Sequence, residues 1–225
     1  MTAVMERPPL LRVDGVSKGY GSGTSHRPVI RSLDLTITAG QKLSLVGPSG
    51  SGKSTLLSLI AGLTRPDTGR ISIGGAAVET LDDTERAALR ADRIGVVLQS
   101  DNLIPFLTAV ENVELAMGFA ARRGDASRAR ELLAELGVAD RRDHLPRQLS
   151  GGEAQRVSIA VSLANRPDLL LADEVVGQLD SATANRVADV VFGSELAVLF
   201  VTHDVNLAAR GERQLHLRDG AVVDG

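Results

Sequence analysis

The stretch Lys42-Leu-Ser-Leu-Val-Gly-Pro-Ser-Gly-Ser-Gly-Lys-Ser-Thr55 joins a short apolar run to a glycine-rich loop. Residues 42–46 are predicted to form a strand, and behind the loop apolar residues recur at the spacing of one helix face. The loop has the pattern Gly-x4-Gly-Lys-Ser, whose backbone N–H groups can wrap around phosphates at the positive end of a helix. A strand, this loop and a helix in that order predict an α/β fold with a nucleoside triphosphate site.

Every residue of the loop is a candidate phosphate-binding residue: Gly47, Pro48, Ser49, Gly50, Ser51, Gly52, Lys53, Ser54 and Thr55. The ammonium of Lys53 is predicted to reach the β- and γ-phosphates of ATP, and the hydroxyl of Ser54 to bind Mg²⁺. An ordinary glycine-rich turn is the alternative, which the complete pattern between a strand and a helix disfavours.

Two acidic residues follow another apolar run, in Leu169-Leu-Leu-Ala-Asp173-Glu174. A buried strand would fix Asp173 where its carboxylate can hold Mg²⁺. Glu174 would then lie beside the γ-phosphate and could polarise the attacking water. Two solvated acids at a strand end are common in isolation, but their place downstream of a phosphate loop favours the catalytic interpretation.

A second glycine pair, in Leu149-Ser-Gly-Gly-Glu153, opens another helix about a hundred residues after the first. Ser150 is a good helix cap, and capping leaves the N–H groups of Gly151 and Gly152 at the same end, so both roles can hold together. One chain with two anion-binding helix starts predicts two copies facing each other, each completing the other's nucleotide site.

Composition narrows the class of protein. The 225 residues carry 25 basic and 28 acidic side chains, a net charge of −3, without a basic block, so nucleic-acid binding is not expected. Cysteine is absent, which excludes disulfides, thiolate metal sites and a cysteine nucleophile. No secretory signal and no apolar run near the ~18 residues of a membrane span are found. We expect a cytoplasmic protein whose membrane work depends on a partner.

The chain is expected to be a single domain, residues 1–225, with an internal division. Strands are predicted near residues 10–13, 33–37, 71–73, 94–98, 169–172 and 196–201. Residues 108–137 and the segment from Gly151 carry Ala, Leu and Val at helical spacing. We therefore expect a nucleotide-binding core with a mixed sheet (about 1–99 and 166–225), interrupted by a helical subdomain (about 100–165).

These motifs, in this order and over nearly the whole chain, resemble the ATP-binding cassette family. The resemblance implies that Tyr20 stacks on adenine, where simple packing is the alternative. It also implies that Gln99 binds the metal or water, that His203 contacts the γ-phosphate, and that Ser150, Gly151 and Gly152 contact the γ-phosphate held by the opposite subunit. Asp180 matches the loop that crosses between subunits. The catalytic residues implied are Glu174, His203 and Lys53, and the metal ligands Ser54, Gln99 and Asp173.

Finer features are similar to the lipoprotein-release and macrolide-export ATPases, among them Gln99-Ser-Asp-Asn-Leu-Ile-Pro105 and Gly177-Gln-Leu-Asp180. Two departures stand out: Val175-Val176 follows Glu174 where the family usually has Pro-Thr, and Val161-Ser162 replaces a commonly found Arg-Ala.

The expected function is that of an ATPase subunit, active as a homodimer, that powers an integral membrane permease from the cytoplasmic side. The alternative is a regulatory ATPase coupled to cell-division or cell-wall machinery. Docking of the partner is expected near Gln99 and residues 100–113, where Leu103, Ile104, Phe106 and Leu107 form an apolar cluster. Core packing is an equally supported interpretation of that cluster.

Overall fold

The computed structural model describes residues 9–21, 23–98, 103–120, 127–174, 181–193, 195–202 and 205–223. The strands are β1 (Pro9–Tyr20), β2 (Arg27–Thr38), β3 (Lys42–Val46), β4 (Thr68–Ile73), β5 (Ala76–Ala77), β6 (Ile94–Val97), β7 (Leu169–Asp173), β8 (Ala197–Val201), β9 (Arg213–Arg218) and β10 (Ala221–Val223). The α-helices are α1 (Lys53–Ile60), α2 (Asp83–Arg93), α3 (Ala109–Phe119), α4 (Ser127–Glu135), α5 (Gly151–Leu163), α6 (Ser181–Phe192) and α7 (Val205–Ala208). Short 3-10 turns are η1 (Gly23–Ser25), η2 (Val78–Thr80), η3 (Ala139–Arg141) and η4 (Pro146–Gln148).

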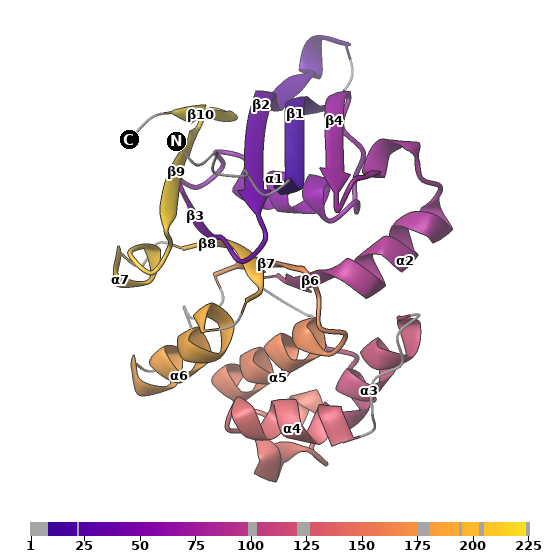
Figure 1. Cartoon of the computed structure of the whole chain (residues 1–225), viewed down its shortest axis with the longest axis vertical. Helices are drawn as coiled ribbons and strands as arrows, with labels where there is room; N and C mark the ends of the chain where they lie inside the picture. The colour runs from indigo at the N-terminus through magenta and orange to yellow at the C-terminus, as the bar shows by residue number, and fades with distance from the viewer. Residues whose placement is uncertain are drawn as a thin grey trace, which may run out of the picture.

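The strands are divided between two sheets (Figure 1). The larger sheet has the order β10-β9-β3-β8-β7-β6; its strands from β9 to β6 run parallel, and β10 joins β9 antiparallel. The smaller sheet, β2-β1-β4-β5, is antiparallel throughout. The predicted α/β fold with a mixed sheet is confirmed, and the antiparallel sheet is a second layer beside it.

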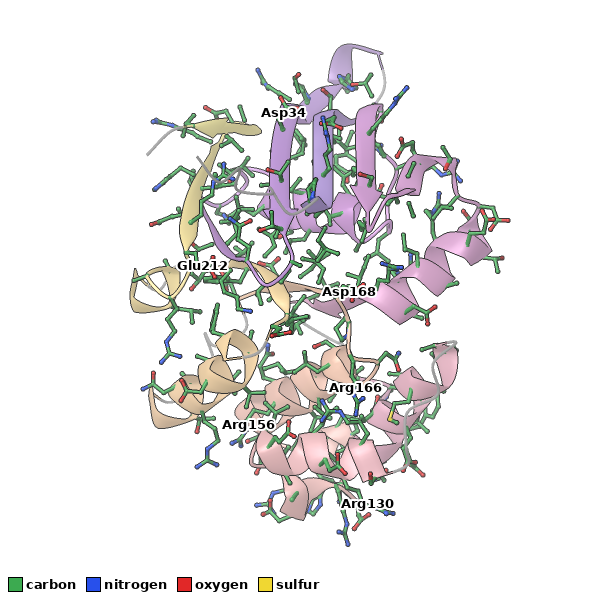
Figure 2. The ribbon with its side chains drawn as sticks, viewed as in Figure 1. Asp34, Arg130, Arg156, Arg166, Asp168 and Glu212 are labelled. Carbon is green, nitrogen blue, oxygen red and sulfur yellow. The ribbon has the colours of Figure 1, made fainter. Side chains whose placement is uncertain are left out.

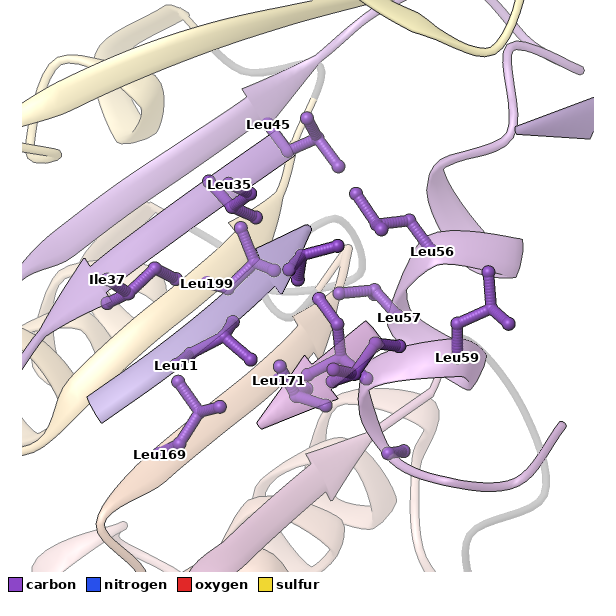
Figure 3. Packing of buried hydrophobic residues seen from close by; sticks show 14 of the residues in the cluster. Leu11, Leu35, Ile37, Leu45, Leu56, Leu57, Leu59, Leu169, Leu171 and Leu199 are labelled. Carbon is purple, nitrogen blue, oxygen red and sulfur yellow. The ribbon is translucent and has the colours of Figure 1, made fainter. Parts of the chain in front are cut away.

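Strands β7 and β8 are buried on both faces. Leu169 and Leu171 pack into one hydrophobic cluster with α1 and the antiparallel sheet, as the facing leucines in Figure 3 show. Leu170, Val198 and Phe200 point the other way, into a cluster with α3, α4, α5 and α6. Burial on both faces explains why these strands are uninterrupted apolar runs rather than alternating ones.

Helices α3, α4 and α5 pack on one another on the side of the larger sheet away from α1 (Figure 1). Thr108 and Ser150 begin α3 and α5 with capping boxes, in which each side chain accepts from the backbone N–H of a glutamate three residues on. The two faces of the larger sheet are thus covered by different helices: α1, which follows the phosphate loop, on one face and α5 on the other.

Among the described residues, no helix is long and apolar enough to cross a bilayer. The α5 helix has 13 residues, which corresponds to about 20 Å, well short of a hydrocarbon core of about 30 Å.

Candidate nucleotide site

The candidate catalytic residues lie where parallel strands end. β3 leads into the phosphate loop, and β7 ends at Asp173, which pairs with Val201 at the end of β8. The carboxyl ends of parallel strands share one edge of a sheet, which is where α/β proteins bind ligands. Strand order therefore brings segments more than a hundred residues apart to one place.

The phosphate loop is shaped by two glycines. A Cβ at Gly47 would lie 2.2 Å from the carbonyl oxygen of Leu217 on β9, so no other residue fits there. Gly52, directly before α1, has φ of 106°, a left-handed conformation that strains any other residue. Gly50, by contrast, faces open space, since among the described residues no atom outside its two chain neighbours lies within 4 Å of where its Cβ would be. The loop is thus closed against β9 and open on the side where phosphate is expected.

Lys53 is held inside this loop. Its side chain is buried, and its Nζ donates to the carbonyl oxygens of Gly47 at 2.7 Å and Pro48 at 2.8 Å. In the part of the chain that the structure describes, no carboxylate forms an ion pair with this ammonium. A buried cation that contacts only neutral carbonyl oxygens would be stabilised by a bound anion. The phosphates of a nucleoside triphosphate supply such an anion.

Ser54 and Asp173 meet across 119 residues of sequence. The Oγ of Ser54 donates to Oδ2 of Asp173 at 2.7 Å, and the Asp173 side chain is 7% exposed. A hydroxyl and a carboxylate are the hard oxygen ligands that Mg²⁺ takes. No group of three acidic, histidine or cysteine residues that could hold a metal ion occurs among the described residues.

Glu174 has a strained backbone. Its φ is +54°, a conformation rare for glutamate, and its backbone N–H donates to the carbonyl oxygen of Val201 at 3.1 Å. Strain of this kind costs about 1–3 kcal/mol and persists only where surrounding structure enforces it, commonly at functional sites. Asp173 is buried and Glu174, the next residue, is half-buried.

A hollow of about 270 Å³ gathers these groups. It is lined by Val29, Ser49, Gly50, Gly52, Lys53, Ser54, Thr55, Asp173 and Glu174. The phosphate loop and the acidic pair predicted from sequence therefore face one space. Val29, on β2, was not predicted; its carbonyl oxygen lies 2.8 Å from where a Cβ of Gly52 would be, a contact between distant segments that leaves no local pattern.

Tyr20 is the last residue of β1 and is 49% exposed, so packing leaves part of its ring accessible to a ligand. The ammonium of Lys18 lies 5.6 Å from the ring centroid and donates to Asp67 at 2.7 Å. Asp67 also accepts from the Gly19 backbone N–H, and these bonds, that from Lys18 first, lower the pKa of the Asp67 carboxyl. Lys18 therefore lies over the tyrosine ring and is held there by Asp67. The sequence does not predict this pair, because the contact joins distant segments of the chain.

Ser150 begins α5 as predicted, and Gly151 at the helix start is exposed. The carboxylate of Glu153 accepts from the Ser150 backbone N–H at 2.8 Å and from the Nε of Arg141 at 2.8 Å. The Ser150 backbone bond first, then the one from Arg141, lower the pKa of the Glu153 carboxyl to about 2. Arg156, labelled in Figure 2, lies one turn further along α5 and donates to the Gly152 carbonyl at 3.2 Å.

The phosphate hollow and the start of α5 are separate. No residue of 149–153 lines the hollow among the described parts of the chain. The helix α1 packs on one face of the larger sheet and α5 on the other. The free N–H groups of Gly151 and Gly152 therefore do not serve the phosphate loop of their own chain.

The predicted residues Gln99, Asp180 and His203 lie outside the described residues, as do Val175 and Val176. The strands that lead toward these positions are in place: β6 ends at Val97 and β8 ends at Val201. Their predicted roles stay predictions.

The apolar cluster at 103–107 has two kinds of member. Leu103 packs against the hydrophobic cluster of the helices, whereas Phe106 is 77% exposed. The side chain of Asn112 fixes the conformation of this segment: it accepts from the Ile104 N–H at 2.7 Å and donates to the Leu107 carbonyl at 3.0 Å. The sequence does not predict this role. Packing explains Leu103 and does not explain Phe106.

Comparison with known proteins identifies the family of this chain. A family model described as "ABC transporter" matches residues 30–177. The lipoprotein-releasing system ATP-binding protein LolD 1 of Rhodospirillum rubrum is 45% identical over 219 residues, 95% of this chain and 97% of that protein. The macrolide export ATP-binding/permease protein MacB of Rhodopseudomonas palustris is 43% identical over 220 residues, 95% of this chain and 33% of that protein.

Among solved structures, a dimer of the ATP-binding cassette MJ0796 in a post-hydrolysis state, bound to ADP and Pi, is similar with a TM-score of 0.89 and 40% identity. The match covers 95% of this chain and 97% of that chain. The chain belongs to the ABC transporter family, as an ATP-binding and ATP-hydrolysing subunit similar to the lipoprotein-release and macrolide-export ATPases.

Proposed function

We propose that two copies of this chain close on two ATP molecules, each held by one phosphate loop and the opposite copy's α5 start. The observation that carries the nucleotide-binding part of this proposal is the hydrogen bond from Ser54 to Asp173 at 2.7 Å, in the hollow that Lys53 and Glu174 also line. The separate α5 start, with its exposed Gly151, supplies anion-binding N–H groups that its own hollow does not use. The dimeric structure of the similar cassette supports the arrangement.

In this proposal the phosphate loop binds and orients the triphosphate. Lys53 would exchange its contacts with the Gly47 and Pro48 carbonyls for oxygens of the β- and γ-phosphates, and Ser54 and Asp173 would hold Mg²⁺ together with Gln99. When bound, the ion would supply positive charge that offsets the negative charge of the phosphates.

Glu174 accepts the proton of the attacking water. The water oxygen bonds to the γ-phosphorus as the bond from that phosphorus to the β,γ-bridging oxygen breaks, which leaves ADP and phosphate. Glu174 lines the hollow together with Asp173, and its φ of +54° is strain of a kind that is common at functional sites; both support this role. His203 contacts the γ-phosphate and Asp180 lies at the contact with the second copy.

The base site is proposed at Tyr20, whose half-exposed ring can stack on adenine. Stacking positions a base without reading its edges, so tolerance of GTP is expected.

We further propose that the subunit works with one or more integral membrane permease subunits and lies on the cytoplasmic face of the membrane through them. The macrolide export protein carries a permease in its own chain, and this chain matches a third of that protein. Within this chain, a hollow of about 690 Å³ between α2, β6, α3 and α5 is lined mainly by apolar side chains, with Thr84, Arg90, Ser162 and Asn165 also in the lining, and includes the exposed Leu63 and Phe119, at 52% and 68%. This hollow and Phe106 are the proposed docking surface.

We propose the division of the chain into a core (about 1–99 and 166–225) and a helical subdomain (about 100–165). Its support is that α3, α4 and α5 pack on one another in a single hydrophobic cluster, on the face of the larger sheet away from α1, although β7, β8 and α6 of the core also contribute to that cluster. Its use would be to let the helices carrying Ser150 and Phe106 move together relative to the phosphate loop.

The experiment is ATP turnover measured against the concentration of the chain. A site built from two copies requires turnover per chain to rise with concentration and then level off, whereas a site complete in one copy gives a constant value. Glu174→Gln should lower turnover at least about a hundredfold with nucleotide affinity retained. Glu131→Gln, the same change on an exposed position of α4, is the control and should match the unmodified chain.

A further inference from the structure

Arg141 lies at the end of η3 and faces the start of α5. Its Nε donates to Oε1 of Glu153 at 2.8 Å, and its Nη1 is 3.0 Å from Asp140. The second oxygen of Glu153, Oε2, accepts from the Ser150 backbone N–H at 2.8 Å. The two carboxylate oxygens therefore tie η3 to the residue that caps the helix.

The helix start depends on Glu153 for its shape. The cap bond from the Glu153 N–H to Ser150 Oγ is long, at 3.3 Å, whereas both bonds to the Glu153 carboxylate are short. Glu153 has 19% of its side chain exposed and Arg141 38%, so solvent competes for both groups. The carboxylate, fixed from two sides, is what sets the position of Ser150 relative to the first turn of α5.

The charge of Glu153 also matters for what the helix start can bind. A carboxylate in the first turn uses the positive end of the helix and would repel a triphosphate at the same N–H groups. Its low pKa keeps it ionised throughout the neutral range. The guanidinium of Arg141 offsets this negative charge and leaves the N–H groups of Gly151 and Gly152 to attract an anion.

We infer that Arg141 is a positioning residue for the nucleotide site of the opposite copy, acting through Glu153 on the α5 start. This inference rests on the proposed function. Arg141 itself touches no nucleotide; it fixes the carboxylate that orients Ser150, and it neutralises that carboxylate.

The neighbouring residue provides a matched control. Arg142 is also an arginine, with 54% of its side chain exposed, and its Nε lies 3.2 Å from Asp143. No contact from Arg142 to residues 150–153 occurs in the described structure. Arg142→Ala removes the same side chain one position away without touching α5.

The experiment measures ATP-driven dimerisation by sedimentation in the Glu174→Gln background, which prevents turnover. An exposed ion pair shifts an equilibrium by about two- to fivefold, and a symmetric dimer contains the pair twice, so Arg141→Ala should weaken dimerisation about tenfold. Nucleotide binding by the single chain should not change, because its phosphate loop is intact. Arg141→Lys, which keeps the charge but not the fork of donors, should recover to within about threefold.

A second pair of variants tests whether Arg141 acts through Glu153. With Glu153→Gln, which removes the charge, the further change Arg141→Ala should have less than about half of its effect, since coupled residues are not additive. An equal effect in both backgrounds would overturn the inference. So would a loss shared by Arg142→Ala, or a melting temperature that falls in step with the loss of dimer.

The same experiment distinguishes failure of the two-copy site from failure of the role of Arg141. If the Glu174→Gln chain stays monomeric in saturating ATP, the two-copy site is wrong and the inference fails with it. If that chain dimerises and Arg141→Ala dimerises at the same ATP concentration, the two-copy site stands and the role of Arg141 alone is refuted.

Discussion

The hydroxyl of Ser54 and the carboxylate of Asp173 lie 2.7 Å apart although 119 residues separate them. Each is held by a different constraint: Ser54 by the first turn of α1, and Asp173 by burial at the end of β7. Side chains fixed this way need little reorganisation when a metal ion and phosphate arrive, which is the basis of electrostatic preorganisation.

Asp173→Asn removes the charge at nearly constant volume, and its amide oxygen can still accept from Ser54. We expect the Mg²⁺ concentration for half-maximal ATPase to rise about ten- to a hundredfold, because a neutral amide is a weaker ligand. A Mg²⁺ titration of turnover checks this. Asp219→Asn, an exposed position in the turn after β9 whose φ of +48° asparagine tolerates, should behave as the unmodified chain. An unshifted titration for Asp173→Asn would remove this residue from the metal site.

Some residues of the site can be predicted from the sequence and others cannot. The phosphate loop and the pair Asp173-Glu174 carry local patterns, and the structure brings both to one hollow. The pairing of Arg141 with Glu153 depends on how η3 folds back on α5, and the strained turn at Glu174 depends on neighbouring strands. Neither leaves a mark in nearby sequence, because the cause of each lies in distant segments.

Within the segment from Leu103 to Phe106, Leu103 is expected to contribute to packing and Phe106 to docking of a partner. Leu103→Asp buries a charge against the helices and should lower the free energy of unfolding by about 1–3 kcal/mol. Phe106→Asp changes a side chain that is 77% exposed and should cost less than about 0.5 kcal/mol. Urea unfolding measures both.

The prediction for docking is checked by recovery of a membrane subunit with the tagged chain from detergent-solubilised membranes. We expect Phe106→Asp to lose the partner while its stability is kept. If Phe106→Asp retains the partner at full yield, Phe106 is not part of the docking surface.

Elements buried on two faces were the easiest to predict. β6, β7 and β8 are mostly apolar in sequence, and β3 carries apolar residues at three of its five positions; the observed bounds of all four agree with prediction within about one residue. Strands β1 and β2 were predicted only over residues 10–13 and 33–37, because polar and glycine positions dilute the pattern in these 12-residue strands. Helix α2 was missed: none of its residues is buried, and only the capping box at Asp82 and Glu85 marked its start.

The molecule as a whole has its two anion-binding helix starts on different faces of one sheet. The phosphate loop precedes α1, and Ser150 precedes α5 on the opposite side (Figure 1). The two helix starts therefore lie apart within one copy. In the proposed two-copy site, a two-fold axis would place each α5 start against the partner's hollow.

The measurement that tests this most directly is the mass of the Glu174→Gln chain in solution, by sedimentation equilibrium, with Mg²⁺ and either ATP or ADP. The two-copy site predicts a mass of twice 23.6 kDa with ATP and a single-chain mass with ADP. A chain that binds one ATP per copy and keeps a single-chain mass at saturating ATP would contradict the account.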